Sequence, residues 1–149
     1  MYLNPEKREY YMGRVIGLPG ESIQVSGRRV YINNRVLDEQ RIMVQPQRND
    51  YGPLTELSTE GTGPYTVYYT KRPVDDFGDS GDFGVDAPFA IPADNYFILG
   101  DNRDNSYDSR YRGAIMGNLI WGKASIIYYS EKMPQRDGVR TERILKKVR

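Results

Sequence analysis

The chain has 149 residues and a formal net charge of +1, and its 38% hydrophobic and 28% charged residues are typical of one folded domain. It contains neither cysteine nor histidine, which excludes disulfides, ordinary zinc sites and catalysis by either side chain. A hydrolase of this composition must use a lysine or a carboxylate as its base, or a metal held by oxygen ligands. The balanced charge creates no field that favours nucleic acid, so we expect no nucleic-acid partner, no metal and no cofactor.

The first part of the chain predicts an irregular start followed by a β-meander. Residues 1–13 are charged and carry no obvious cap, which predicts a short helix or an irregular arm. Residues 10–18 form an apolar, β-prone run that ends at Pro19-Gly20. Alternating stretches follow at residues 22–25, 29–32 and 35–37, with turns at Ser26-Gly27 and Asn33-Asn34. Asparagine tolerates the left-handed backbone that such a turn can require.

The middle of the chain predicts a long surface insertion and several short strands. Residues 45–63 are rich in Pro, Gly, Asn, Thr and Glu and lose apolar periodicity, which indicates an insertion with a helical turn near residues 54–57. Residues 65–70 predict a strand, residues 72–87 an acidic loop, and residues 89–91 and 96–99 two further strands. The acidic loop lacks the final bidentate glutamate of a calcium-binding loop. Since no stretch resembles an interdomain linker, we interpret residues 1–149 as a single domain.

The last part of the chain predicts the longest apolar strand, at residues 119–129, and a basic tail from residue 135. Residues 141–148 predict a short helix with one apolar face. No signal peptide opens the chain. No apolar run reaches the roughly 20 residues that span a bilayer. The frequent use of tyrosine, valine and isoleucine predicts a mainly β fold.

Two motifs carry the functional information. They are GRVIGLPGE at residues 13–21 and GDNRDNSYDSRYRG at residues 100–113. Taken alone, the second motif would indicate a solvated turn of mixed charge, because Asn and Asp side chains build tight turns. Together, the motifs resemble the two downstream conserved boxes of type I signal peptidases. Residues 82–84 and 91–102 are similar to that family's approach to its last box, and residues 117–129 to its closing strand, so the resemblance covers most of residues 10–130.

The resemblance implies a fold class, a mechanism and a location. The implied fold is mainly β, with coiled antiparallel sheets of the signal peptidase type and a long surface insertion. The implied mechanism is attack by a serine on a peptide carbonyl, with a neutral lysine as base, and burial lowers the pKa of that lysine. The implied partners are exported preproteins. The implied location is the outer face of the cytoplasmic membrane, reached through a membrane anchor that is not in this chain.

The catalytic residues of the family are not matched in this sequence. The family's lysine directly precedes the arginine of the first box, and that position is Gly13, which has no side chain to accept a proton. The family's nucleophile belongs to an upstream SxSMxPT segment, and residues 1–12 contain no serine. Ser106 corresponds to the serine that orients the lysine. Lys123, beside a glycine in a predicted strand, is interpreted as a solvent-facing lysine and not as a substitute base.

The supporting residues of the two boxes are matched. The resemblance assigns structural roles to Arg14, Asp101, Asn102, Arg103, Asn105, Asp108, Ser109 and Arg110. It implies an ion pair between Asp108 and Arg110 and a second pair between Arg14 and Asp101 that ties the boxes together. It also implies that the two asparagines fix the turn.

Three hypotheses follow. The first is a natural non-catalytic protein that assists the processing or assembly of exported proteins. It would be most like the inactive signal-peptidase-like proteins of Gram-positive pilus assembly clusters, whose partners are pilin subunits. The second is an active signal peptidase, represented here by a truncated or altered chain in which Gly13 replaces the lysine. The third is a self-cleaving Ser-Lys protein of the LexA type, which the last box argues against.

Overall fold

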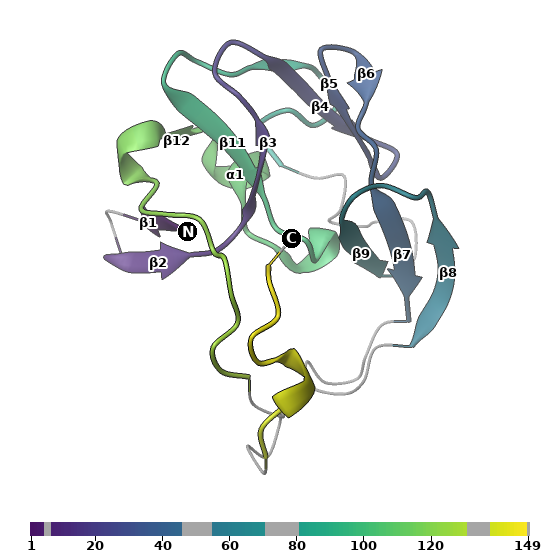
Figure 1. Ribbon diagram of the computed structural model, residues 1–149. Helices are drawn as coiled ribbons and strands as arrows, with labels where there is room; N and C mark the ends of the chain where they lie inside the picture. The colour runs from purple at the N-terminus through teal and green to yellow at the C-terminus, as the bar shows by residue number, and fades with distance from the viewer. Residues whose placement is uncertain (5–6, 46–54, 71–80, 131–137, 149) are drawn as a thin grey trace.

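In the computed structural model of the protein, residues 1–4, 7–45, 55–70, 81–130 and 138–148 are described (Figure 1). The described strands form four small sheets. Their members, in sheet order, are β1 (Tyr2–Asn4) and β2 (Glu9–Tyr11); β10 (Phe89–Ala90), β4 (Ser22–Ser26), β5 (Arg29–Ile32) and β6 (Arg35–Val36); β12 (Ile115–Met116), β11 (Asn95–Leu99) and β3 (Arg14–Gly17); and β8 (Glu56–Glu60), β7 (Gln40–Val44) and β9 (Thr66–Thr70). The helical pieces are η2 (Arg103–Asn105), α1 (Ser109–Arg112), η3 (Gly117–Leu119) and η4 (Thr141–Arg143).

The predicted mainly β fold with antiparallel sheets is confirmed, with one exception to the antiparallel pattern. Three of the sheets pair their strands only in antiparallel fashion. In the fourth sheet β7 is antiparallel to β8 but parallel to β9, with Gln40 opposite Thr66. The chain between β7 and β9 is long enough to allow this return, since a parallel pair needs a crossover and not a hairpin.

The core forms where the predicted meander packs against β11. Alternation in β4 turns Ile23 and Val25 inward, as expected for a strand with one buried face. The tight turn between β5 and β6 has positive φ at Asn33 (51°) and Asn34 (65°), as the sequence predicted. The buried cluster consists of Ile23, Val25, Val30, Val85, Ile91, Phe97 and Leu99.

The strand pair β3–β11 lies at the centre of the molecule (Figure 1). In this view the β7–β8–β9 sheet lies to its right and the β1–β2 hairpin to its left. Because Leu99 at the end of β11 pairs with Arg14 at the start of β3, the residues just beyond them are also brought together. The two sequence motifs, which are separated by residues 22–99, therefore meet at this end of the pair.

The predicted start of the chain is wrong in two respects. Instead of a helix or irregular arm, β1 and β2 form an antiparallel hairpin in which Tyr2 pairs with Tyr11. The side chain of Tyr2 is 3% exposed and its ring stacks on that of Tyr11. The predicted apolar strand over residues 10–18 is divided, because β2 ends at Tyr11 and β3 begins at Arg14. Tertiary contacts of two tyrosines override the weak local signal here.

Three further predictions are wrong: one strand without a partner and two helical segments. Residues 119–129 contain no strand and only isolated bridges, of Ile120 with Tyr2 and of Ile126 with Lys147. The predicted helix over residues 141–148 is only the single turn η4. The helical turn near residues 54–57 is replaced by β8, an exposed edge strand, and residue 54 lies outside the described residues. About half of the predicted insertion, part of the acidic loop and the start of the tail also lie outside them (residues 46–54, 71–80 and 131–137).

The predicted strands at residues 65–70, 89–91 and 96–99 are confirmed as β9, β10 and β11 with small shifts of their ends. Within the described part of the chain, no helix has the length and apolarity to cross a membrane.

Candidate functional site

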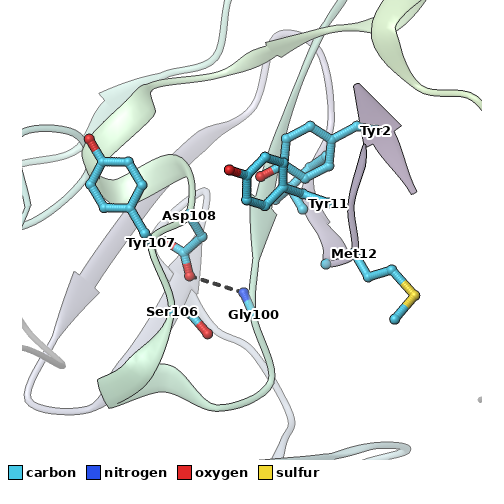
Figure 2. Close-up of a pocket in the computed structure, with 9 residues that line it drawn as sticks. Tyr2, Tyr11, Met12, Gly100, Ser106, Tyr107 and Asp108 are labelled. Atoms are coloured by element: carbon cyan, nitrogen blue, oxygen red, sulfur yellow. Dashed lines mark hydrogen bonds between the residues drawn. The ribbon is translucent and has the colours of Figure 1, made fainter. Parts of the chain in front are cut away.

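Gly13 and Ser106 line one cavity of about 200 Å³ at the end of the β3–β11 pair. Its described lining consists of Tyr2, Tyr11, Met12, Gly13, Ile98, Gly100, Ser106, Tyr107 and Asp108. Figure 2 shows Ser106, Tyr107 and Asp108 on one side, with the rings of Tyr2 and Tyr11 side by side above them. The structure thus brings together the two positions that the sequence assigned to the base and to the serine that orients it.

Gly13 is closely packed against β11. A Cβ atom at this position would lie 2.5 Å from Ile98 Cγ2 and 3.2 Å from the carbonyl oxygen of Leu99. Any side chain at position 13 therefore requires Ile98 to move, because real Cβ contacts are never this short. The position lacks a base, and the neighbouring side chain already takes up the space where a side chain would begin.

Ser106 is held by the turn that precedes it. Its Oγ donates a hydrogen bond of 2.6 Å to the carbonyl oxygen of Asn102, which also accepts from the backbone N–H of Asn105. Gly100 packs so closely that a Cβ atom there would overlap the Oγ of Ser106. The side chains of Asn102 and Asn105 are exposed and make no hydrogen bond within the described chain. The turn is therefore built by backbone groups, and by glycine at position 100.

Asp108 connects the end of β11 to the start of α1. Its Oδ2 accepts from the backbone N–H of Gly100 at 3.0 Å, as Figure 2 shows, and its Oδ1 accepts from the backbone N–H of Arg110 at the helix N-terminus. The Arg110 guanidinium contacts both carboxylate oxygens at 2.9 Å, and both side chains are buried. The same guanidinium donates to the carbonyl oxygen of Arg103 at 2.6 Å. This pair thus fixes the backbone on both sides of Ser106.

Arg14 and Asp101 join the first box to the last one. The guanidinium reaches the carboxylate in a two-point contact, with Nε–Oδ1 at 2.9 Å and Nη2–Oδ2 at 2.8 Å. The hydrogen bond to Asp101 raises the pKa of Arg14, against the effect of burial, which lowers it. Arg14 also lies over the ring of Tyr65, with its Cζ 4.1 Å from the ring centroid.

Two further residues were singled out from the sequence. Ser109 is buried, and its hydroxyl accepts a hydrogen bond of 3.0 Å from the N–H of Ile98. Lys123 is exposed.

A second buried ion pair was missed by the sequence analysis. Glu39, which precedes β7, and Arg103 are each 1% exposed, and the guanidinium donates to both carboxylate oxygens. Tyr65 donates a further hydrogen bond of 2.9 Å to Glu39, and Arg103 also donates to the carbonyl oxygen of Gly100. Glu39 lies outside both motifs, so nothing in the sequence marked it. It ties the β7–β8–β9 sheet to the segment that carries Ser106.

A stack of tyrosines and one arginine was also missed. Arg112 lies between two rings, with its Cζ 4.3 Å from the centroid of Tyr11 and 4.8 Å from that of Tyr107. The ring of Tyr2 stacks on that of Tyr11, with their centroids 5.9 Å apart, and the ring of Tyr111 stacks on that of Tyr107, with their centroids 5.3 Å apart. We call these five residues the arginine–tyrosine stack. It attaches the β1–β2 hairpin to the last box and so closes the cavity on one side.

The cavity residues cannot carry out acid–base catalysis of the serine–lysine type by themselves. None of the nine residues that line the cavity is a lysine, and Asp108, its carboxylate, is paired with Arg110. Among the described residues, no three carboxylates lie close enough together to hold a metal ion. The geometry is therefore that of a well-supported cavity with one serine hydroxyl, three tyrosines and no lysine to accept the proton of the serine.

The comparisons with known proteins agree with the two motifs. A sequence profile described as "Signal peptidase, peptidase S26" matches residues 2–129. The chain belongs to this signal peptidase family. It is 34% identical over 126 residues to signal peptidase I of Leptolyngbya laminosa, covering 85% of this chain and 44% of that protein. It is also 34% identical over 128 residues to signal peptidase I of Bacillus amyloliquefaciens, covering 85% and 55%.

This signal peptidase family member therefore spans about half the length of those relatives. Among solved structures, signal peptidase I from Enterococcus faecalis matches with a TM-score of 0.48 and 22% identity, covering 81% of this chain and 87% of that one.

Proposed function

We propose that this chain is a signal-peptidase-like protein without the catalytic lysine, which serves as a non-catalytic accessory or chaperone in the processing or assembly of exported proteins such as pilins. The observation that carries the proposal is Gly13, which lines the cavity together with Ser106 at the family's lysine position. A serine needs a neighbouring base to become a nucleophile, and glycine has no group that accepts a proton. The cavity is retained, so binding of a polypeptide is the activity that this geometry supports.

The proposed partners are exported preproteins, and pilin subunits among them. This part of the proposal is supported by family membership together with the intact frame around the cavity. The proposed location is the outer face of the cytoplasmic membrane, with attachment through a membrane anchor. A balanced net charge of +1 supports a polypeptide partner over nucleic acid.

A second candidate function is an active type I signal peptidase, of which this chain is an altered or truncated form. It is favoured by the completeness of the supporting frame, since the Arg14–Asp101 and Asp108–Arg110 pairs are in place and Ser106 faces the cavity. This candidate requires a serine segment of the SxSMxPT type upstream in the gene of origin, and a lysine at position 13.

Binding and cleavage can be measured separately with one reagent. A fluorescent peptide that contains a bacterial signal sequence and its cleavage site is titrated into the 149-residue chain, and mass spectrometry follows the peptide over a long incubation. We expect saturable binding without cleavage, for both the unmodified chain and Gly13→Lys. Ser106→Leu should weaken binding by narrowing the cavity, whereas Asn105→Leu, at the exposed neighbouring position, is the matched control.

Two results would contradict the proposal. Absence of saturable binding would remove the accessory role. Cleavage at a single site by the unmodified chain, or by the full-length protein of origin, would favour the active peptidase instead.

A further inference from the structure

Arg112 differs from the other arginines around the cavity in having no carboxylate partner. Arg14, Arg103 and Arg110 are paired with Asp101, Glu39 and Asp108, respectively. Arg112 forms no ion pair and no side-chain hydrogen bond with any described residue, and its Nε is covered without an acceptor.

Two carboxylates that interact with members of the arginine–tyrosine stack, those of Glu9 and Asp108, are engaged elsewhere. Glu9 accepts a hydrogen bond of 2.9 Å from the hydroxyl of Tyr11 and makes no ion pair with Arg112. Asp108 is occupied by Arg110 and by the N–H of Gly100. The positive charge of Arg112 is therefore not neutralised within the described part of the molecule. A guanidinium without a counter-charge can bind an anionic group of another molecule.

Arg112 lies beside the cavity. It is not one of the lining residues, but the rings of Tyr11 and Tyr107, against which it packs, both line the cavity, and in Figure 2 the hydroxyls of Tyr2 and Tyr11 point to the side on which Tyr107 lies. Burial raises the pKa of Tyr2, and the positive charge of Arg112 lowers it in part. The guanidinium is therefore next to the aromatic wall that an occupant of the cavity would contact.

The arginine–tyrosine stack also limits the shape of the ligand. Both faces of the guanidinium are covered by rings, so a ligand can approach only its edge. A carboxylate is planar, carries one negative charge and matches that edge with two parallel hydrogen bonds. A phosphate carries a larger charge, and the three neighbouring arginines that could share it are already paired.

We infer that Arg112 binds a carboxylate carried by the polypeptide that occupies the cavity, namely an aspartate or glutamate side chain or a C-terminal carboxylate. The inference rests on the proposed function in one respect, that the occupant is a polypeptide. The preference for an acidic group is a property of this chain's own arginine–tyrosine stack.

The Nε–H group of Arg112 gives a direct test by NMR. The ¹⁵N-labelled chain is titrated with N-acetylglutamate α-amide, whose side-chain carboxylate is free. A separate titration uses N-acetylglutamine α-amide, which lacks that negative charge. We expect a saturable shift of the Arg112 Nε–H signal with the glutamate compound. The glutamine compound should bind with a dissociation constant at least about tenfold higher. Because Arg112→Gln has no Nε–H group, the variants are compared by the backbone amide signals of Tyr11 and Tyr107, the two rings beside the guanidinium, which should also shift in the unmodified chain. Arg112→Gln should abolish the shift of these amide signals with the glutamate compound, while Arg35→Gln, an exposed arginine in β6, should keep it.

Further variants keep the test decisive. If Arg112→Gln does not fold, Arg112→Lys replaces it, and it should weaken binding of the glutamate compound because an ammonium cannot form the two-point contact. Equal responses to the two compounds, or an unchanged response in the Arg112 variant, would overturn the inference. Arg112-dependent binding to vesicles containing phosphatidylglycerol, without a response to the glutamate compound, would overturn it in favour of a lipid phosphate.

A parallel titration with the signal-sequence peptide separates this inference from the proposed function. Peptide binding that is unaffected by Arg112→Gln refutes the role of Arg112 and leaves the accessory function in place. If the unmodified chain does not bind the signal-sequence peptide but still responds to the glutamate compound, the accessory function alone is refuted.

Discussion

The carboxylate of Glu39 accepts hydrogen bonds from both terminal nitrogens of the Arg103 guanidinium, 64 residues further along the chain. The pair is almost fully buried and joins the β7–β8–β9 sheet to the segment that forms the cavity. A buried ion pair gives little net stability compared with apolar residues, but the removal of one partner leaves the other charge uncompensated. This pair therefore acts as a fixed connection between two parts of the fold.

Glu39→Ala should lower the free energy of unfolding by about 3–5 kcal/mol, because it leaves Arg103 charged and buried without its partner. Urea denaturation measures the change. The matched control is Glu60→Ala, which removes the exposed end of the Arg41–Glu60 pair and should cost about 1 kcal/mol or less. Equal losses for the two variants would show that the Glu39–Arg103 pair is not a structural connection.

Asp108→Asn should also cost about 3 kcal/mol or more, because the buried Arg110 loses its counter-charge. The N-terminus of α1 should fray at the same time, since Asp108 is its capping residue. Thermal unfolding gives the stability, and amide hydrogen exchange of residues 109–112 gives the local effect. Asp86→Asn, at an exposed turn position, serves as the control. Unchanged exchange in α1 would argue against the capping role.

Gly13→Ala should destabilise the chain by about 1–3 kcal/mol, because the new Cβ overlaps the side chain of Ile98. In the double variant with Ile98→Ala, the alanine at position 13 should cost less, giving a coupling of roughly 0.5–3 kcal/mol. Gly122→Ala is the control, since a Cβ at that position would meet no atom within 4 Å. Additive effects of the two substitutions would contradict the close packing at position 13.

Stability should fall at alkaline pH. Burial raises the pKa of Tyr65, and the adjacent Glu39 carboxylate raises it further, while burial also raises the pKa of Tyr69 and Tyr2. The folded state therefore holds these phenolic protons more tightly than the unfolded chain, whose tyrosines titrate near pH 10. Their contribution is complete below about pH 10 and is lost as the pH rises through the folded-state values, by about 1.4 kcal/mol per pH unit and tyrosine.

Urea denaturation between pH 8 and pH 11 measures this decline. Tyr65→Phe should make the slope above about pH 10 shallower, because one linked proton is removed. Tyr128→Phe, which removes the same group from an exposed position, is the matched control. A slope in Tyr65→Phe as steep as in the unmodified chain would exclude Tyr65 as a linked group.

The sequence was sufficient where local pattern and motif carry the information. Alternation in β4 and β5 predicted strands with one buried face, and the Asn33-Asn34 turn followed from the tolerance of asparagine for positive φ. Residues 100–113 together with residues 13–21 identified the signal peptidase family, because few unrelated chains would match so many positions of the last box in a fixed order. Gly13 showed the lack of a base without any structure.

Tertiary structure decided every feature that depends on contacts between distant residues. Glu39 lies outside both motifs, and Arg112, although within the last box, had no role assigned from the sequence. They are important because folding buries Glu39 against Arg103 and places Arg112 against the rings of Tyr11 and Tyr107. The apolar run at residues 119–129 fails as a strand for the same reason, since a strand needs a neighbour that supplies hydrogen bonds. Sequence alone thus determined the family and the glycine at position 13. Only the tertiary structure could decide which side chains surround Gly13, because packing and desolvation act between residues far apart in the chain.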